Sequence, residues 1–438
     1  MGRRPQGRRR GVQFPVNFPV RGEGIVETLL GYRIVSFGGL VVMVAIAWAL
    51  SENRRAVRIR VVLWGLALQM VLGLLLLSPW GVNMGLWFFD GTQKLFNKLI
   101  SCSDTGASFL FGKLVSDYSI GAVVAFEVLP IVIFVSAVSG VLYHLRVVQA
   151  VVRGMARLMH WTMRISGAES VAAALFVFFG IECVTAIGRY IKSMTRSELF
   201  VVMTAFMATI ASSVMVAYVS FGANPGHLLI ASLMSAPAAV AIAKVMIPET
   251  EKPLTIGLVE FEPEIVSQNI LDAAASGAAD GARLAINIAA MLIAFVGLVA
   301  LANVIVGFAG NLAGAPGLTL QKLFGYAFYP FAVVMGVPVK DALGVGQLLG
   351  TKTVLNEFLA YQSMQEMVRQ GLLSPRSVVI ATYALCGFAN FGSIAILIGG
   401  IGSLVPERRS EVAALGFKSL IAGTLAAFMT ACFAGMMA

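Results

Sequence analysis

Long stretches of the chain contain no charged residue, and they determine the architecture that the sequence predicts. A helix needs about 20 mostly apolar residues to cross the hydrocarbon core of a bilayer. Several of the uncharged runs are long enough for one span and the longest for two; they cover residues 34–50, 61–89, 199–243, 284–321 and 377–406. We predict eight transmembrane helices, near 32–51, 57–80, 118–145, 197–222, 226–247, 284–308, 377–402 and 411–437.

Two further apolar stretches are too short or too interrupted to cross. Residues 170–188 are uncharged apart from a lone Glu182, and residues 344–370 carry Lys352, Asn356 and Glu357 among apolar neighbours. Each stretch fits two half-length helices that dip into the membrane and return to the same face, the first pair joined near Gly180. Between residues 80 and 118, charged and aromatic residues are mixed, which predicts an interfacial amphipathic helix.

An internal repeat connects the two predicted hairpins. Arg196 and a following serine open the span after the first hairpin, and Arg376 and a following serine open the span after the second. From each arginine the same offset reaches a hydroxyl side chain, Ser213 in one copy and Ser393 in the other. The arginine content of the loops predicts that the first copy enters the membrane from the cytoplasm and the second from outside. Inverted repeats with broken helices are typical of secondary transporters whose binding site lies near the midplane.

Arginine-rich loops orient the chain. Loops at 54–60, 146–164 and 408–409 fall on one side of an eight-span protein, which the positive-inside rule assigns to the cytoplasm. The same count places both termini outside, although residues 1–10 hold five arginines, so the side of this tail stays open. The predicted parts are a basic tail (1–31), scaffold spans with an interfacial helix (32–145), a first transport repeat (146–247), a cytoplasmic linker with an amphipathic helix (248–283), a scaffold span with its connection (284–330) and a second transport repeat (331–438).

Composition excludes several functional classes. Hydrophobic residues make up 58% of the chain, above the roughly 45–50% of soluble domains, and the mean hydropathy is +0.86. The net charge of +10 does not indicate nucleic-acid binding, because the basic residues gather at the ends of apolar runs. The sequence shows no phosphate loop, catalytic triad or metal-binding set, so we expect neither an enzyme nor a bound cofactor or metal. We expect a multi-pass cell-membrane protein, in the inner membrane if the source is Gram-negative.

Glu182 and Glu357 are the strongest candidates for chemistry. A carboxylate at membrane depth is costly and persists mainly when it is paired, protonated or in contact with water. Each glutamate could instead cap backbone at a helix break, which is a structural role. If both face one cavity, they could accept hydroxyl hydrogens from a polar solute, and one could take up a coupling proton. The segments 385–393 and 209–214 add amide, hydroxyl and glycine positions, for which helix packing is the alternative.

Seven segments together resemble the concentrative nucleoside transporter family over most of the chain, from about residue 117 to the C-terminus. They are VLPIVIF at 128–134, SGAES at 166–170, MTRSELF at 194–200, ATIASSV at 208–214, ASLMSAPAA at 231–239, NEFLAY at 356–361 and ALCGFANFGS at 384–393. The resemblance implies a homotrimer in which each subunit has a scaffold part and a mobile transport part that carries nucleoside by an elevator-like motion. The membrane lipid and a coupling cation are its other expected partners.

The resemblance also implies roles for individual residues. Glu357, Asn390 and Ser393 match the positions that hold the ribose, and Glu182 matches a glutamate that helps to recognise the base. Val214 matches a position beside the substrate, and Phe388 matches a pocket wall. The complete set of expected substrate-binding residues is Gly180, Glu182, Val214, Asn356, Glu357, Phe388, Asn390 and Ser393, and the candidates for the coupling ion are Glu182, Glu357 and Thr209.

The first hairpin departs from the family pattern. Members read close to NIFVGQTEAP, whereas this chain reads LFVFFGIECVT at 175–185. Gly180 and Ile181 replace two base-binding polar residues, and the asparagine that helps to coordinate sodium becomes Leu175 or Phe176. We therefore prefer a proton to sodium as the coupling ion, and we expect a nucleoside-like solute with a different or modified base. The alternatives are a sodium-coupled nucleoside symporter and a receptor that binds without translocating.

Overall fold

The computed structural model describes residues 23–77, 84–115, 124–255 and 267–438, except for the side chains of residues 23–29, 84 and 182. In these ranges every regular element is a helix, as predicted. The helices are α1 (Glu23–Ala49), α2 (Ile59–Leu76), α3 (Met84–Phe111), α4 (Leu129–His144), α5 (Val147–Met163), α6 (Gly167–Leu175), α7 (Val184–Ile191), α8 (Arg196–Ala208), α9 (Ser212–Ser220), α10 (Pro225–Met246), α11 (Ile270–Leu312), α12 (Leu320–Val334), α13 (Val339–Val354), α14 (Glu357–Arg369), α15 (Pro375–Leu385), α16 (Phe391–Leu404) and α17 (Arg409–Met437). Short turns of helix at Arg54–Ala56 (η1), Gly112–Val115 (η2), Val124–Val128 (η4), Ile181–Cys183 (η5) and Pro406–Arg408 (η6) complete the set.

Seven stretches of helix in the described residues are long and apolar enough to cross a membrane, and each overlaps a predicted span. They are Leu30–Ala49, Ile59–Leu76, Val124–His144, Arg196–Ser220, Pro225–Met246, Ile270–Leu312 and Pro406–Met437. The remaining predicted span, 377–402, is not one helix. It consists of α15 and α16, separated by an irregular segment from Cys386 to Asn390, and α16 alone is too short to count as a span.

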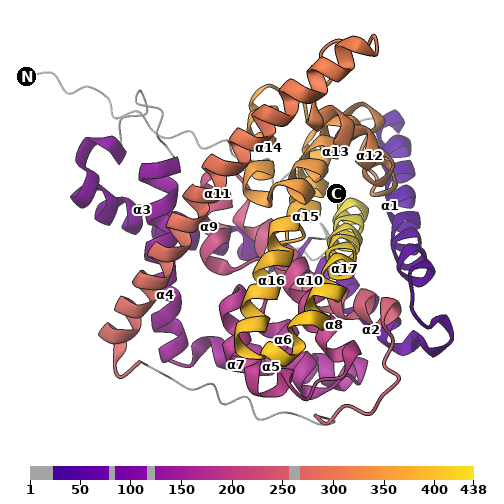
Figure 1. The fold of residues 1–438 in the computed structure, drawn as a ribbon. Helices are drawn as coiled ribbons and strands as arrows, with labels where there is room; N and C mark the ends of the chain where they lie inside the picture. The colour runs from indigo at the N-terminus through magenta and orange to yellow at the C-terminus, as the bar shows by residue number, and fades with distance from the viewer. Residues whose placement is uncertain (1–22, 78–83, 116–123, 256–266) are drawn as a thin grey trace, which may run out of the picture.

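The predicted span at 284–308 is the central part of a much longer helix. Helix α11 has 43 residues and runs obliquely across the molecule, where it packs along α4 (Figure 1). The predicted span begins 14 residues too late because Asp280 and Arg283 precede the uncharged run, but these two side chains are exposed and pair with each other. Helix α12, which packs against α13, was not predicted; Pro330 in its interior and a length of only 15 residues concealed it.

The order of elements repeats. Helices α6 and α7 are followed by the broken helix α8–α9 and the long helix α10, and helices α13 and α14 are followed by the broken helix α15–α16 and the long helix α17. The α6–α7 pair and the α13–α14 pair lie toward opposite ends of the helix bundle (Figure 1). This arrangement has the order and the opposed placement that the sequence repeat predicts. Entry of either pair into a bilayer stays a prediction.

The repeated elements form the centre of the molecule. In the α8–α9 stretch 94% of the most apolar window is buried, whereas none of the corresponding window of α11 is buried. Helix α10 packs against α8 and α17, and α1 and α2 cover these central helices from one side (Figure 1). The apolar surface of α1, α2, α4 and α11 is therefore the surface available to lipid, and the polar positions discussed below lie inside.

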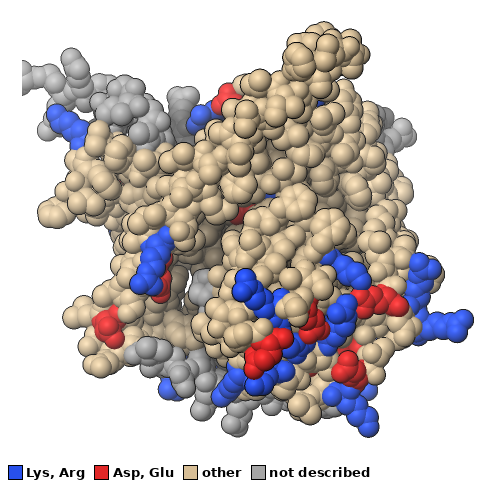
Figure 2. All heavy atoms as spheres, in the orientation of Figure 1, with Lys and Arg blue, Asp and Glu red and all other residues tan. Residues whose placement is uncertain are grey.

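Charged side chains gather at one end of the molecule, near the start of α17 and the end of α7, and the face above them is almost free of charge (Figure 2). At this end Glu52, in the α1–α2 connection, pairs with Arg196 at 3.0 Å and with Lys418 at 2.5 Å. Lys192 pairs with Glu407 at 3.2 Å. The charged end agrees with a membrane–water boundary on the side that the sequence assigns to the cytoplasm.

The two arginines of the repeat both contact α1 or its connection. Arg196 binds Glu52, just beyond the end of α1, whereas Arg376 is buried and donates to the Ser36 hydroxyl at 3.2 Å and to the Gly336 carbonyl at 2.9 Å. Equivalent residues of the two repeats therefore attach to one peripheral helix, Arg376 near its middle and Arg196 just beyond its C-terminal end.

Candidate functional site

The two broken helices touch each other where they are interrupted. The Phe388 backbone N–H, in the α15–α16 break, donates to the Thr209 carbonyl at 3.2 Å, at the end of α8. Gly387 has a φ of +126°, and a Cβ there would lie 2.7 Å from the carbonyl oxygen of Ala208. Only glycine fits this position, because the conformation and the close approach both exclude a side chain. The main chains of the two repeats are thus in direct contact.

Glu357 connects three elements at this place. It is the first residue of α14, and the preceding Asn356 caps that helix by accepting the Leu359 N–H at 2.9 Å. The Glu357 side chain is buried; one carboxylate oxygen accepts the Tyr218 hydroxyl and the other accepts the Asn390 amide, each at 2.9 Å. The second hairpin, α9 and the α15–α16 break therefore meet at one carboxylate.

Asn390 is fixed at both ends of its amide. Its oxygen caps α16 by accepting the Ser393 N–H at 2.8 Å, while its NH₂ group donates to Glu357. The Ser393 side chain is buried and its hydroxyl forms no hydrogen bond with the described residues, so this oxygen is available to a ligand. Val214, near the start of α9, is buried, and Phe388 packs on Phe206 with ring centroids 5.5 Å apart.

Tyr218 and Lys352 were not assigned a role from the sequence. Tyr218 stacks on Tyr361 at a centroid distance of 4.6 Å, and the Lys352 ammonium, almost fully buried, donates to the Ala384 carbonyl at 2.9 Å. The repeat did not reveal Tyr218, because its counterpart is Ile398. Two signals in the sequence could have found them. Tyr218 is a hydroxyl side chain within an uncharged run, and Lys352 lies five positions before Glu357 in a hairpin that is predicted to enter the membrane.

The first hairpin approaches the same place through its backbone. The Phe178 carbonyl accepts both the backbone N–H of Ser212, at 3.0 Å, and its hydroxyl, at 2.8 Å, where α9 begins. Gly180 is buried, and the side chain of Glu182 lies outside the described part of the structure. A shared cavity for Glu182 and Glu357 therefore stays a prediction.

The positions that the family resemblance links to a coupling cation lie among apolar side chains. Leu175 and Phe176 are buried, and the Phe176 ring contacts Phe206 at a centroid distance of 5.6 Å. The Thr209 hydroxyl donates to the Ala205 carbonyl at 2.8 Å, which leaves its lone pairs as the acceptors that it can offer. The described residues contain no group of three or more histidine, cysteine or acidic side chains that could hold a metal ion.

Buried polar side chains at touching helix breaks, inside two structural repeats, define a membrane carrier of the broken-helix class. Comparison with known proteins agrees. Family models described as the N-terminus of a Na⁺ dependent nucleoside transporter, as nucleoside recognition, and as the C-terminus of that transporter match residues 38–114, 125–225 and 227–435.

Individual relatives cover nearly the whole chain. Solute carrier family 28 member 3 of Rattus norvegicus is 42% identical over 420 residues, which are 92% of this chain and 59% of that protein. An uncharacterized transporter of Bacillus subtilis, YutK, is 42% identical over 404 residues, covering 91% of this chain and 98% of that protein. A solved structure of CNTnw in an inward-facing substrate-bound state is 38% identical with a TM-score of 0.86, covering 93% of this chain and 98% of that one.

The chain belongs to the concentrative nucleoside transporter family. It is accordingly a multi-pass membrane protein of a transporter family and not an enzyme. The chain spans about 59% of the length of the first mammalian relatives that it matches.

Proposed function

We propose that this protein is a secondary active transporter that imports nucleosides or nucleoside-like solutes by an elevator-like alternating-access motion. The observation that carries the proposal is the buried Glu357 carboxylate, held by Tyr218 and Asn390 where the two broken helices meet. Family membership supports the substrate class, and so does the substrate-bound state of the related CNTnw structure.

The geometry suits the sugar of a nucleoside. An ionised carboxylate offers about four lone-pair sites. Tyr218 and Asn390 occupy one on each Glu357 oxygen, so each oxygen retains capacity for a ribose hydroxyl. The Ser393 hydroxyl would supply a further hydrogen bond, and the apolar side chains of Val214 and Phe388 would border the base. Gly180 and Glu182 would face the base from the first hairpin.

We propose a proton as the coupling ion, taken up by Glu182 or Glu357. The support is the apolar packing around Leu175 and Phe176, where the family resemblance places a sodium-coordinating asparagine. Sodium coupling is the second candidate, because the matching family models are described as Na⁺ dependent and Thr209 keeps an oxygen beside the break. The homotrimer implied by the resemblance is part of the same proposal.

Uptake of labelled nucleosides into proteoliposomes tests the proposal. We expect accumulation when a proton gradient is applied without sodium, and none when both gradients are absent. Strict dependence on a sodium gradient would refute proton coupling but leave nucleoside transport intact. Saturable nucleoside binding to the purified protein without any uptake would refute transport and support the receptor alternative.

A further inference from the structure

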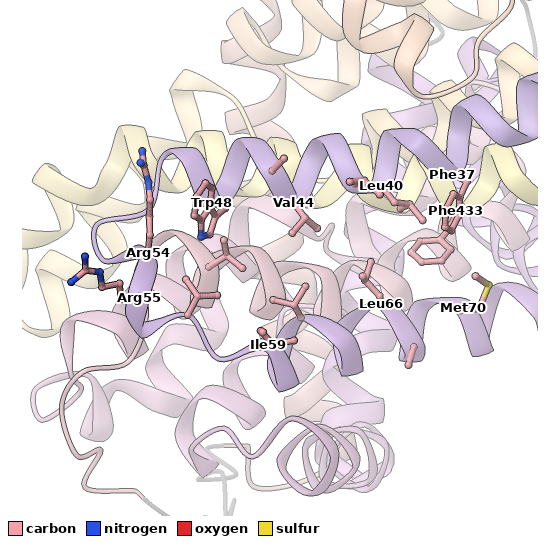
Figure 3. A pocket seen from close by; sticks show the side chains of 16 residues that line it. Phe37, Leu40, Val44, Trp48, Arg54, Arg55, Ile59, Leu66, Met70 and Phe433 are labelled. Carbon is pink, nitrogen blue, oxygen red and sulfur yellow. The ribbon is translucent and has the colours of Figure 1, made fainter.

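An apolar groove lies between α1 and α2, away from the substrate site (Figure 3). Its volume is about 890 Å³, and its walls include Leu40 and Val44 of α1 and Leu66 of α2. Val245 of α10 and Phe433 of α17, both buried, close its inner side. The groove therefore opens on the outer surface of the helix bundle and is lined almost entirely by hydrocarbon.

The groove has the length of one membrane leaflet. On α1 it is lined from Phe37 to Trp48, and at 1.5 Å per residue this is about 17 Å. Half of the hydrocarbon core is about 15 Å thick. Trp48, exposed at one end, has the amphipathic ring that is enriched at the membrane–water interface. An extended acyl chain entering from that interface would have room along the groove.

The same end carries two arginines, Arg54 and Arg55, in the η1 turn between the helices (Figure 3). Arg54 donates to the Ala49 carbonyl at 2.7 Å and lies 5.1 Å from the centre of the Trp48 ring. In the described part of the chain neither arginine forms an ion pair with a carboxylate, although Glu52 close by pairs with Arg196 and Lys418. A guanidinium is suited to a phosphate, which its fork of N–H donors can bind in a bidentate manner.

We propose that the groove binds one anionic phospholipid of the cytoplasmic leaflet, with an acyl chain between α1 and α2 and the headgroup phosphate on Arg54 and Arg55. The positive-inside rule places this loop in the cytoplasm, where anionic lipids concentrate. The groove combines apolar walls of leaflet length with two arginines at one end, and a phospholipid matches both features. A second copy of the chain would have to insert an apolar ridge into the groove and also place an acidic side chain on the arginines.

Lipid retention by the full chain, purified in neutral detergent, tests the charge part. The probes are dioleoylphosphatidylglycerol and dioleoylphosphatidylcholine, and native mass spectrometry measures how many lipids stay bound at each concentration. We expect one phosphatidylglycerol per chain to bind more tightly than phosphatidylcholine. The double variant Arg54→Gln/Arg55→Gln should lose about thirtyfold in phosphatidylglycerol affinity. The control, Arg58→Gln, changes an exposed arginine of the same connection that lines a different hollow and should bind as the wild type does.

Filling the groove tests the acyl-chain part. Ala45 lines the groove and is exposed, so Ala45→Phe should displace the lipid, whereas Val42→Phe on an exposed, non-lining position of α1 should not. If Ala45→Phe does not fold, Ala67→Phe on α2 provides the same test. Equal affinity for the two lipids, an unchanged double variant, or retention by the filled variants would each overturn the proposal. A lower oligomeric mass of the filled variants would show that a second copy occupies the groove, which would also overturn it.

Discussion

The Glu357 carboxylate accepts the side-chain amide of Asn390 at 2.9 Å, across 33 positions of sequence. Each of these residues sits at the start of a helix: Glu357 opens α14, and Asn390 caps α16. The hydrogen bond therefore joins the start of α14 to the break between α15 and α16.

Replacing the Glu357 carboxylate should weaken ligand binding. In Glu357→Gln one side-chain oxygen becomes an NH₂ group, which cannot accept from Asn390 and offers fewer acceptors to ribose hydroxyls. Hydrogen bonds to charged groups contribute roughly 1.5–3 kcal/mol, so we expect nucleoside affinity to fall at least about tenfold. Thermal-shift titration and proteoliposome uptake measure this. Glu366→Gln, an exposed position on the same helix, is the control; unchanged uptake by Glu357→Gln would disprove the ribose role.

Tyr218→Phe should distinguish the contribution of the Tyr218 hydroxyl from that of its ring. The variant keeps the stacking on Tyr361 but removes the hydrogen bond to Glu357. We expect a loss of about 1.5–3 kcal/mol, shared between folding stability and ligand affinity. Scanning fluorimetry with and without ligand separates the two. Tyr326→Phe, which changes an exposed tyrosine, should alter neither stability nor affinity. If Tyr218→Phe also leaves both unchanged, the Tyr218–Glu357 hydrogen bond contributes to neither.

Gly387→Ala should disturb the contact between the two breaks. The added methyl group would meet the Ala208 carbonyl oxygen, a backbone atom that cannot rotate away, at a residue with φ of +126°. Strain of this kind costs about 1–3 kcal/mol, so the yield of folded protein and the melting temperature should fall. Gly399→Ala in α16 meets nothing within 4 Å and should be neutral or stabilising. Equal melting temperatures of the two variants would contradict the clash.

A buried ionic cluster at the charged end should be essential to stability. The Lys244 ammonium pairs with Glu169 and with Glu249, the latter at 3.1 Å, and it donates to the Ser197 hydroxyl at 3.0 Å. Removing one partner from a buried ion pair costs about 3–5 kcal/mol, because the remaining charge stays desolvated. Lys244→Met should therefore unfold at a much lower temperature, and Lys252→Met, an exposed residue at the same hollow, should not. Similar melting temperatures would mean that the cluster is solvated.

Glu52 should make the stability of the folded protein depend on pH. A hydrogen bond from Arg196 holds the pKa of Glu52 below its ordinary value, with a further contribution from Lys418. A depressed pKa stabilises the folded state at pH values above the ordinary pKa, and this contribution is lost as the pH falls through the depressed one. Melting temperatures measured from pH 7 to pH 3 should therefore fall less for Glu52→Gln than for the wild type. Glu251→Gln, which changes another exposed glutamate, should follow the wild type; a parallel fall in all three proteins would refute the linkage.

The long uncharged runs predicted most of the fold, because a bilayer requires uninterrupted apolar length and that requirement is visible along the chain. The same criterion failed wherever an element need not cross alone. Helix α12 is short and contains Pro330, and α11 extends past the exposed Asp280–Arg283 pair. In both cases the apolar run is interrupted along the sequence while the helix itself continues.

At the site, the repeat and the family resemblance identified Glu357, Asn390 and Ser393, which the structure brings to one helix break. Tyr218 could not be found in this way, since its partner is far away in sequence and its repeat counterpart is an isoleucine. The contact between Gly387 and Ala208 was equally invisible, because it depends on how two helices cross and not on either local sequence.

One hydrogen bond at the crossing of the two broken helices lies entirely in the main chain. The Phe388 N–H of the second repeat donates to the Thr209 carbonyl of the first. Every residue except proline carries a main-chain N–H, so substitution of the Phe388 or Thr209 side chain by another residue leaves this donor and acceptor in place. Side chains around the candidate site can therefore change without removing this main-chain link between the two repeats.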